Sequence, residues 1–175
     1  KLTSTGGKLD VTDPDAGQDH FVAQTGAAGA HGSFTMQPDG TWSYTLDNGQ
    51  PAVQALKTGE QLTDTLTVST IDGTTRQITV TINGTDDKAA IAGTAVGTVT
   101  EDKLTSTGGK LDVTDPDAGQ DQFVPQTGAA GAHGSFTVQP DGTWSYALDN
   151  GQPAVQALKT GDQITDTLTV STIDG

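Results

Sequence analysis

Apolar and polar residues alternate along several short stretches of this chain. Residues 34–36 (Phe-Thr-Met) and 42–46 (Trp-Ser-Tyr-Thr-Leu) flank the turn-forming sequence Pro-Asp-Gly at 38–40. Residues 66–68 (Leu-Thr-Val) run into a second Asp-Gly turn at 72–73. A period of two is typical of strands with one buried face, and Asp-Gly favours tight turns between them. The pattern predicts short antiparallel strands.

Two further elements follow from the same reasoning. Ile78, Val80 and Ile82 share one face of a returning strand, and a strand is expected to end at residues 9–11. Only residues 51–56 suggest a helical turn, with Pro51 at the start and Gly59 beyond the end. Seven or so short strands predict an all-β fold, a Greek-key β-sandwich.

The chain repeats itself with a period of 102 residues, so that 1–73 return as 103–175. The two copies differ only at His20/Gln122, Ala23/Pro125, Met36/Val138, Thr45/Ala147, Glu60/Asp162 and Leu62/Ile164. Such a period is too long for a solenoid unit and fits tandem sandwich domains. We expect one domain at 1–87 and another at 88–175.

Each predicted domain lacks one strand. A complete unit would begin near Lys88, with a first strand at 91–100, and would end with the equivalent of 74–87. The first domain therefore lacks its first strand and the second lacks its last, which exposes unpaired sheet edges. We expect these strands to come from the rest of the molecule or from neighbouring molecules by strand exchange.

The composition limits the partners. Twenty-two acidic residues against eight basic ones give a net charge of −14, which disfavours nucleic acid and anionic membrane surfaces. Hydrophobic content is only 32%, which predicts modest cores, and there is no cysteine to form disulfides. No apolar run is long enough to span a membrane and no signal peptide is visible.

Several motifs together resemble the VCBS repeats of giant RTX-type bacterial surface adhesins, a branch of the cadherin-like superfamily. They are residues 97–102 (Gly-Thr-Val-Thr-Glu-Asp), the hairpin at 32–48, and 62–68 leading to Asn-Gly-Thr-Asp-Asp at 83–87. The resemblance implies calcium bound at the joint between consecutive domains. It also implies a secreted or cell-surface location.

The resemblance assigns the calcium ligands to several acidic segments. Calcium takes about six to eight oxygen ligands, and residues two apart in an extended segment point to the same side, as in Asp-Pro-Asp. The interdomain site is expected to use Asn83, Thr85, Asp86 and Asp87 of the linker with Asp115, Asp117, Asp121 and Asp174. Asp13, Asp15, Asp19 and Asp72 would form the incomplete equivalent of the first domain, and Glu101 would serve the next joint.

Other functions find less support. Trp42 and Tyr44 could stack on sugars, but their alternation favours the core. His31 and His133 have no second His or Cys nearby for zinc, and no catalytic triad or phosphate-binding loop is present. We therefore expect no enzyme, but calcium-stiffened extender repeats of an adhesin that contact neighbouring repeats. Alternatives are a module that binds polysaccharide or protein, and homophilic self-association.

Overall fold

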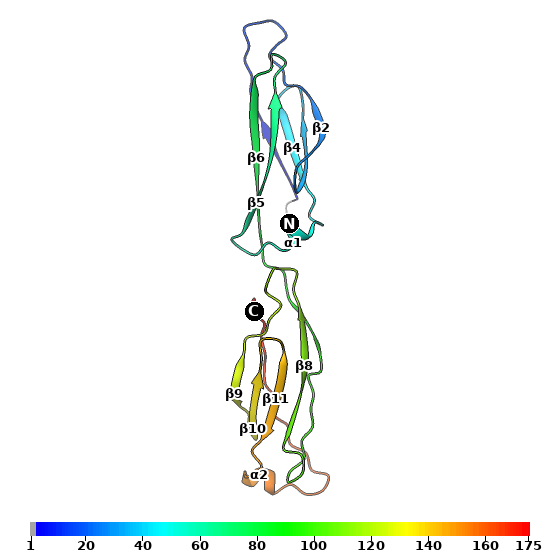
Figure 1. Cartoon of the computed structure of the whole chain (residues 1–175), viewed down its shortest axis with the longest axis vertical. Coiled ribbons are helices and arrows are strands. Elements are labelled where there is room, and N and C mark those ends of the chain that lie inside the picture. Colours follow the sequence, from blue (N-terminus) through cyan, green and yellow to red (C-terminus); the bar gives the residue numbers. More distant parts are fainter. Residues whose placement is uncertain (1–2) are drawn as a thin grey trace. The chain divides into compact units, whose positions relative to one another are not determined.

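The computed structural model describes residues 3–175 and divides the chain into two units, with the boundary in the sequence between Asp86 and Asp87 (Figure 1). The first unit contains β1 (Ser4–Lys8), β2 (Gln24–Ala28), β3 (Gly32–Met36), β4 (Thr41–Leu46), α1 (Pro51–Gln54), β5 (Gln61–Ser69) and β6 (Thr75–Asn83). The second contains β7 (Ala90–Gly93), β8 (Ser106–Thr114), β9 (Gln126–Ala130), β10 (Gly134–Val138), β11 (Thr143–Leu148) and α2 (Pro153–Gln156). Among the described residues, no helix is long and apolar enough to cross a membrane.

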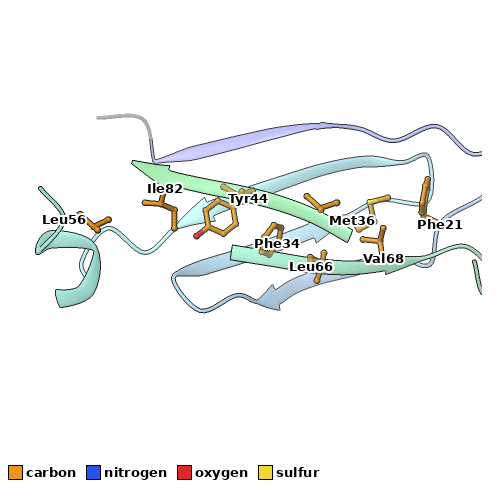
Figure 2. Close-up of a cluster of buried hydrophobic side chains, with 10 residues drawn as sticks. Phe21, Phe34, Met36, Tyr44, Leu56, Leu66, Val68 and Ile82 are labelled. Carbon is orange, nitrogen blue, oxygen red and sulfur yellow. The ribbon is translucent and has the colours of Figure 1, made fainter. Parts of the chain in front are cut away.

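The first unit packs a four-stranded antiparallel sheet, in the order β1-β4-β3-β2, against the hairpin β5-β6. The predicted alternation places every second side chain of β3, β5 and β6 inside. Phe34 lies against Tyr44, with ring centroids 4.7 Å apart, and Val68 is fully buried in the same cluster (Figure 2). Apolar burial on this scale is the main stabilising term for so small a unit.

The turn between β3 and β4 forms as predicted. Gly40 has a φ of 86°, which only glycine adopts without strain, and the Asp39 carboxylate accepts hydrogen bonds from the amide and the hydroxyl of Thr41. A Cβ at Gly40 would overlap the carbonyl oxygen of Leu9. The hairpin therefore fixes where the chain that follows β1 can run.

The second unit contains a five-stranded sheet in the order β7-β8-β11-β10-β9. The strand predicted at 91–100 forms only as β7, over the four residues Ala90–Gly93. It ends at Gly93, which has a φ of 96°. β7 pairs with the last four residues of β8, from Leu111 to Thr114. Among the described residues, the equivalent segment of the first unit has no such partner, so β1 stops at Lys8 and the strand end predicted at 9–11 is wrong there.

The second unit is less completely packed than the first. Residues 163–171 repeat β5 but form no strand, and no partner equivalent to β6 lies beside them in the described chain. Its buried core cluster consists of Leu111, Phe123 and Val138. Phe136, whose counterpart Phe34 is fully buried, is only half-buried. One face of this core is therefore open.

Candidate functional site

Acidic residues gather at one end of the second unit, where the chain enters it and where β8 ends. The sequence Asp-Pro-Asp folds back on itself, and the Asp117 amide donates to the Asp115 carboxylate over 2.7 Å. The Asp87 amide donates to Asp117 Oδ2 over 2.6 Å. The chain entering the unit is thus bonded to the predicted acidic loop.

Asp174 joins this cluster from the last turn of the unit. It accepts hydrogen bonds from the Thr172 side chain and the Ala89 amide, and the first of these contributes most to lowering its pKa. Its carboxylate also lies within hydrogen-bonding reach of Asp115. Two carboxylates this close repel each other, and a cation between them would relieve that repulsion.

Burial makes the cluster unusual. Asp117 is 1% exposed, and three carboxylate oxygens at this end are buried without a hydrogen-bond partner in the protein: Asp115 Oδ2, Asp117 Oδ1 and Asp174 Oδ1. An unpartnered buried carboxylate oxygen is costly because it has lost its water. These atoms fit a hard cation, whose preferred ligands are carboxylate and carbonyl oxygens.

The protein side chains do not form a closed cage in this conformation. Within residues 3–175, no group of three or more His, Cys, Asp or Glu side chains has the arrangement of a metal site. The hydrogen bond between Asp87 and Asp117 joins the Asp87 backbone amide to the Asp117 carboxylate, so it does not pair the two carboxylates. The predicted ligand Asp121 is exposed. The unit thus brings together Asp87, Asp115, Asp117 and Asp174, whereas Asp121 is exposed.

The equivalent acids of the first unit are open to solvent. Asp15 donates its amide to Asp13, as in the second unit, but its side chain is exposed. Asp72 is held by Thr70 and Thr74, and Asp19 contacts the neighbouring His20. In the described part of this unit, no residue from outside the acidic loop donates a hydrogen bond to Asp15 as the Asp87 amide does to Asp117 in the second unit.

The remaining linker residues of the predicted site belong to the first unit. Asn83 accepts a hydrogen bond from Gln61 over 2.7 Å, and Asp86 exchanges two bonds with Thr58, at 2.8 and 3.1 Å. Thr85 is exposed. The structure gives these residues contacts within their own unit, and their share in a joint site stays a prediction.

Glu101 lies half-buried in the turn that connects Thr100 to Leu104. The next residue, Asp102, has a φ of 56° and is fixed by Asn150, which accepts from its amide and donates to its carboxylate over 2.7 Å. The bonds from Asn150 and Gln156 lower the pKa of Asp102. Sequence reasoning missed this anchor, although both copies of the repeat carry the same Asn and Gln.

A second feature that sequence reasoning missed is an inward-facing carboxylate in each unit, which is buried in the first unit and half-buried in the second. Asp64 is 1% exposed and accepts from the Ala30 amide, the His31 amide and the Tyr44 hydroxyl. A signal was available, because Asp64 occupies an inward position of the alternating strand, where apolar residues are expected.

The same network recurs around Asp166. Burial alone would raise the pKa of Asp166, but the bonds from His133, Tyr146 and Ala132 outweigh it and the pKa is lowered. Burial and Asp166 together raise the pKa of Tyr146 to about 12. The ring nitrogen Nδ1 of His133 lies 3.3 Å from Gln152 Oε1, so this histidine has a structural contact of its own.

One shallow hollow recurs in both units. It is lined in the first unit by Gly32, Ser33, Thr45, Leu46, Asp47 and Gln50, and in the second by Gly134, Ser135, Ala147, Leu148, Asp149 and Gln152. Trp42 is half-buried beside the core and Tyr44 is buried, so Tyr44 offers no surface for a sugar.

No curated protein matches the chain. One solved structure, titled "Protocadherin gammaB7 EC3-6 cis-dimer structure", matches with a TM-score of 0.48 and 18% identity over 85% of this chain and 36% of that chain. The chain thus spans about a third of the length of that protocadherin chain.

A family model described as "Bacterial cadherin-like domain" matches residues 1–84 and again residues 86–175. The all-β architecture agrees with this match, since the chain forms tandem cadherin-like β-sandwich domains. Domains of this kind are typically extracellular and non-catalytic, and they suggest adhesion-type repeat modules. The chain belongs to the bacterial cadherin-like domain family, of which it carries two tandem copies.

Proposed function

We propose that the two units are calcium-stiffened extender repeats of a secreted or surface-anchored bacterial adhesin, which space a binding region away from the cell. The observation that carries the proposal is the set of buried, unpartnered carboxylate oxygens on Asp115, Asp117 and Asp174. A bound cation would remove the cost of burying them. The cadherin-like fold often binds calcium between repeats.

The residues that would hold the ion come from three segments of the second unit. Asp87 comes from the linker, Asp115 and Asp117 from the loop after β8, and Asp174 from the final turn. Calcium needs about six to eight oxygens, so carboxylates, backbone carbonyls and water would share the coordination. Asn83, Thr85 and Asp86 are the proposed contribution of the first unit.

The stiffening follows from electrostatics. Without a cation, the Asp115 and Asp174 carboxylates repel each other, which favours separation of the loop from the final turn. A divalent cation turns that repulsion into attraction and ties both segments to the linker at Asp87. Calcium binding is thereby coupled to local order.

Calcium titration of the whole chain tests this proposal. Extracellular modules bind calcium at about 10⁻⁴–10⁻³ M, so a large excess should stabilise the second unit by about 2–3 kcal/mol. We expect a higher melting temperature and a narrower distribution of sizes in small-angle scattering. If calcium changes neither quantity, the proposed mechanism is wrong.

A matched pair of substitutions locates the site. Asp117→Asn should abolish the calcium-dependent rise in melting temperature, because it removes the carboxylate at the centre of the cluster. Asp15→Asn, at the equivalent exposed position of the first unit, should leave that rise unchanged. Equal effects of the two substitutions would place the ion elsewhere.

A second candidate function is binding of polysaccharide or a protein partner. The hollow that recurs beside Asp47 and Asp149 favours it, since five of its six lining residues are the same in both units and only Thr45 is replaced, by Ala147. A glycan array distinguishes the candidates: binding lost in a Ser33→Trp, Ser135→Trp variant would favour an adhesive module over a spacer. Calcium-dependent sedimentation of the chain tests homophilic association.

A further inference from the structure

The hollow that recurs on both units is a property of the repeated segment. The first unit includes β6 and the second includes residues 88–102, two segments for which the other unit has no counterpart in the described chain. The same hollow is nevertheless present in both, so neither segment forms it or fills it. Its volume is about 320 Å³ in the first unit and about 340 Å³ in the second, which is at the lower end for small-molecule sites.

Main-chain hydrogen bonds fix the acidic wall of each hollow. The Asp149 amide donates to the His133 carbonyl over 2.8 Å, and the Asp149 carbonyl accepts from the Gln152 amide over 3.1 Å. The same two bonds hold Asp47 in the first unit, at 2.9 and 3.2 Å. The hollow is thus largely pre-formed, which lowers the entropic cost of binding a ligand.

The loop that leads into β10 is anchored as well. The Ala132 and His133 amides donate to the Asp166 carboxylate over 2.8 and 2.9 Å. The next two residues, 134 and 135, line the hollow. Asp64 holds the corresponding loop of the first unit through the same bonds. The inward-facing carboxylate of each unit therefore keeps one wall of the hollow in place.

Each hollow presents polar groups that a ligand can use. In the second unit, Asp149 Oδ1 accepts from the Gly151 amide over 3.3 Å, and Oδ2 has no hydrogen-bond partner in the described chain. Gln152 Oε1 lies 3.3 Å from His133 Nδ1, which leaves the Gln152 amide nitrogen to donate to a ligand. The Ser135 hydroxyl adds a group that both donates and accepts.

The charges around the hollow favour a cationic ligand. The lining contains one carboxylate in each unit, and none of the lining residues is basic. The whole chain carries a net charge of −14. A ligand ammonium group is therefore attracted by the carboxylate and by the field around it, whereas an acidic sugar is repelled.

The rest of the lining fits a sugar ring better than a bare ammonium group. Leu148 is half-buried and gives the hollow an apolar side, against which ring carbons can lie. Carboxylate, amide and hydroxyl groups around it suit a ring of hydroxyls, which donate and accept at once. A compact pyranose that also carries an ammonium group matches both properties.

We propose that the recurring hollow binds an amino sugar with a free ammonium group, as one residue of a polysaccharide. This inference rests on the second candidate function above and names the class of ligand. The ammonium group lies against the Asp47 or Asp149 carboxylate, and ring hydroxyls accept from the Gln50 or Gln152 amide. The site is independent of calcium.

An NMR titration of the whole chain tests the ligand class, with a fully deacetylated glucosamine tetramer as the probe. We expect saturable shifts of the backbone amide signals around Asp47 and Asp149. An N-acetylated tetramer should bind about tenfold more weakly, because it lacks the charge that strengthens the hydrogen bonds to the carboxylate. Equal binding of the two tetramers, or no shift around either hollow, would overturn the proposal.

Paired substitutions separate the hollow from general attraction between a polycation and an acidic protein. Asp47→Asn with Asp149→Asn should weaken binding about tenfold, while Asn keeps the turn. Asp10→Asn with Asp112→Asn changes the net charge equally at exposed positions outside the lining and should leave binding unchanged. The same spectra show that each variant is folded. If both pairs weaken binding equally, or if tetralysine shifts the same signals as strongly, the proposal fails.

The two hollows also provide an internal comparison. Thr45 places a hydroxyl in the lining where Ala147 has a methyl group. One additional hydrogen bond should make the first hollow bind about twofold to tenfold more tightly, and Ala147→Thr should remove the difference. A difference that persists in Ala147→Thr would contradict the placement of the ring beside this position.

A neutral probe keeps this inference distinct from the function on which it rests. A glucose tetramer that binds the hollow as tightly as the glucosamine tetramer would overturn the amino-sugar assignment while supporting the second candidate function. If none of the three sugars binds in the hollow, both the assignment and a polysaccharide-binding role of the hollow are wrong. Neither result bears on calcium, because the titration is performed with calcium removed by a chelator.

Discussion

The buried carboxylate of Asp64 provides the sharpest test of how the first unit is held together. Its oxygens accept bonds from the amides of Ala30 and His31, at 2.8 and 2.9 Å, and from the hydroxyl of Tyr44 at 2.8 Å. These bonds connect strand β5 of the hairpin to the loop before β3 and to β4. The substitution Asp64→Ala removes the acceptor and leaves all three donors in place.

The energetic cost of Asp64→Ala depends on how well water can replace the lost carboxylate as the hydrogen-bond acceptor of each donor. The Tyr44 hydroxyl is buried and the His31 amide partly buried, and each unsatisfied buried donor costs about 1–3 kcal/mol. Ala30 is exposed, so its amide can bond water at little cost. We therefore expect Asp64→Ala to lower the free energy of unfolding of the first unit by about 3–4 kcal/mol.

The second unit supplies the control. Asp166 makes the equivalent bonds but lies at the open edge and is half-buried, so water can replace the lost acceptor. Asp166→Ala should therefore cost only about 1–2 kcal/mol. Urea unfolding in a Trp144→Phe background reports the first unit through Trp42, and a Trp42→Phe background reports the second.

Equal costs for the two substitutions would refute the argument that burial sets the magnitude. The milder substitution Tyr44→Phe removes one bond to a charged acceptor and should cost about 2 kcal/mol. Combined with Asp64→Ala, it should cost less than the sum of the single changes, because both remove the same bond. Additive costs would show that the hydroxyl and the carboxylate act independently.

Three further outcomes are expected. Gly142→Ala should destabilise the second unit by about 3 kcal/mol in urea unfolding, because φ is 84° and a Cβ would overlap the Leu111 carbonyl, whereas Gly151→Ala, with its nearest atom at 3.6 Å, should be nearly neutral. The folded state raises the pKa of Tyr146 from its ordinary value of 10 to about 12, so stability should fall as pH rises from 10 to 12, and a pH series of melts should show no such fall from this group in Tyr146→Phe. The Thr143 amide, Lys110 and the Thr143 hydroxyl lower the pKa of Asp141 to about 2, so its contribution should be lost as pH falls from about 4 to 2, and an acid titration of Asp141→Asn should lack that loss.

Local patterns were enough to predict the elements that depend on neighbouring residues. The turn at Gly40, the helical turn that begins at Pro51 and the inward face of β6 all form as expected. Each is fixed within a few residues, by turn chemistry or by alternation. The lengths of β1 and β7 could not be predicted in the same way, because a strand extends only as far as a partner pairs with it.

The candidate site was predictable in its composition and less so in its arrangement. The sequence indicates that acids converge near Asp115 and Asp117, and the structure brings Asp87 and Asp174 to the same loop. The sequence could not indicate that Asp121 stays exposed, because the conformation of this loop depends on packing against residues outside it. The burial of Asp64 is also a property of the assembled sheets, although its inward position was visible.

Residues 74–102, which lie between the two copies of the repeated segment, account for most of the difference between the two units. Of the six repeated positions that differ, only Met36/Val138 is buried in both units, and Leu62 packs, partly buried, against the core of the first. Yet Asp15 is exposed where Asp117 is buried, and Phe34 is buried where Phe136 is not. β6 covers the core of the first unit, whereas Asp87 and β7 complete the acidic end and the sheet of the second. Changes in residues 74–102 should therefore alter stability and ion binding more than equally conservative changes in the loops common to both units.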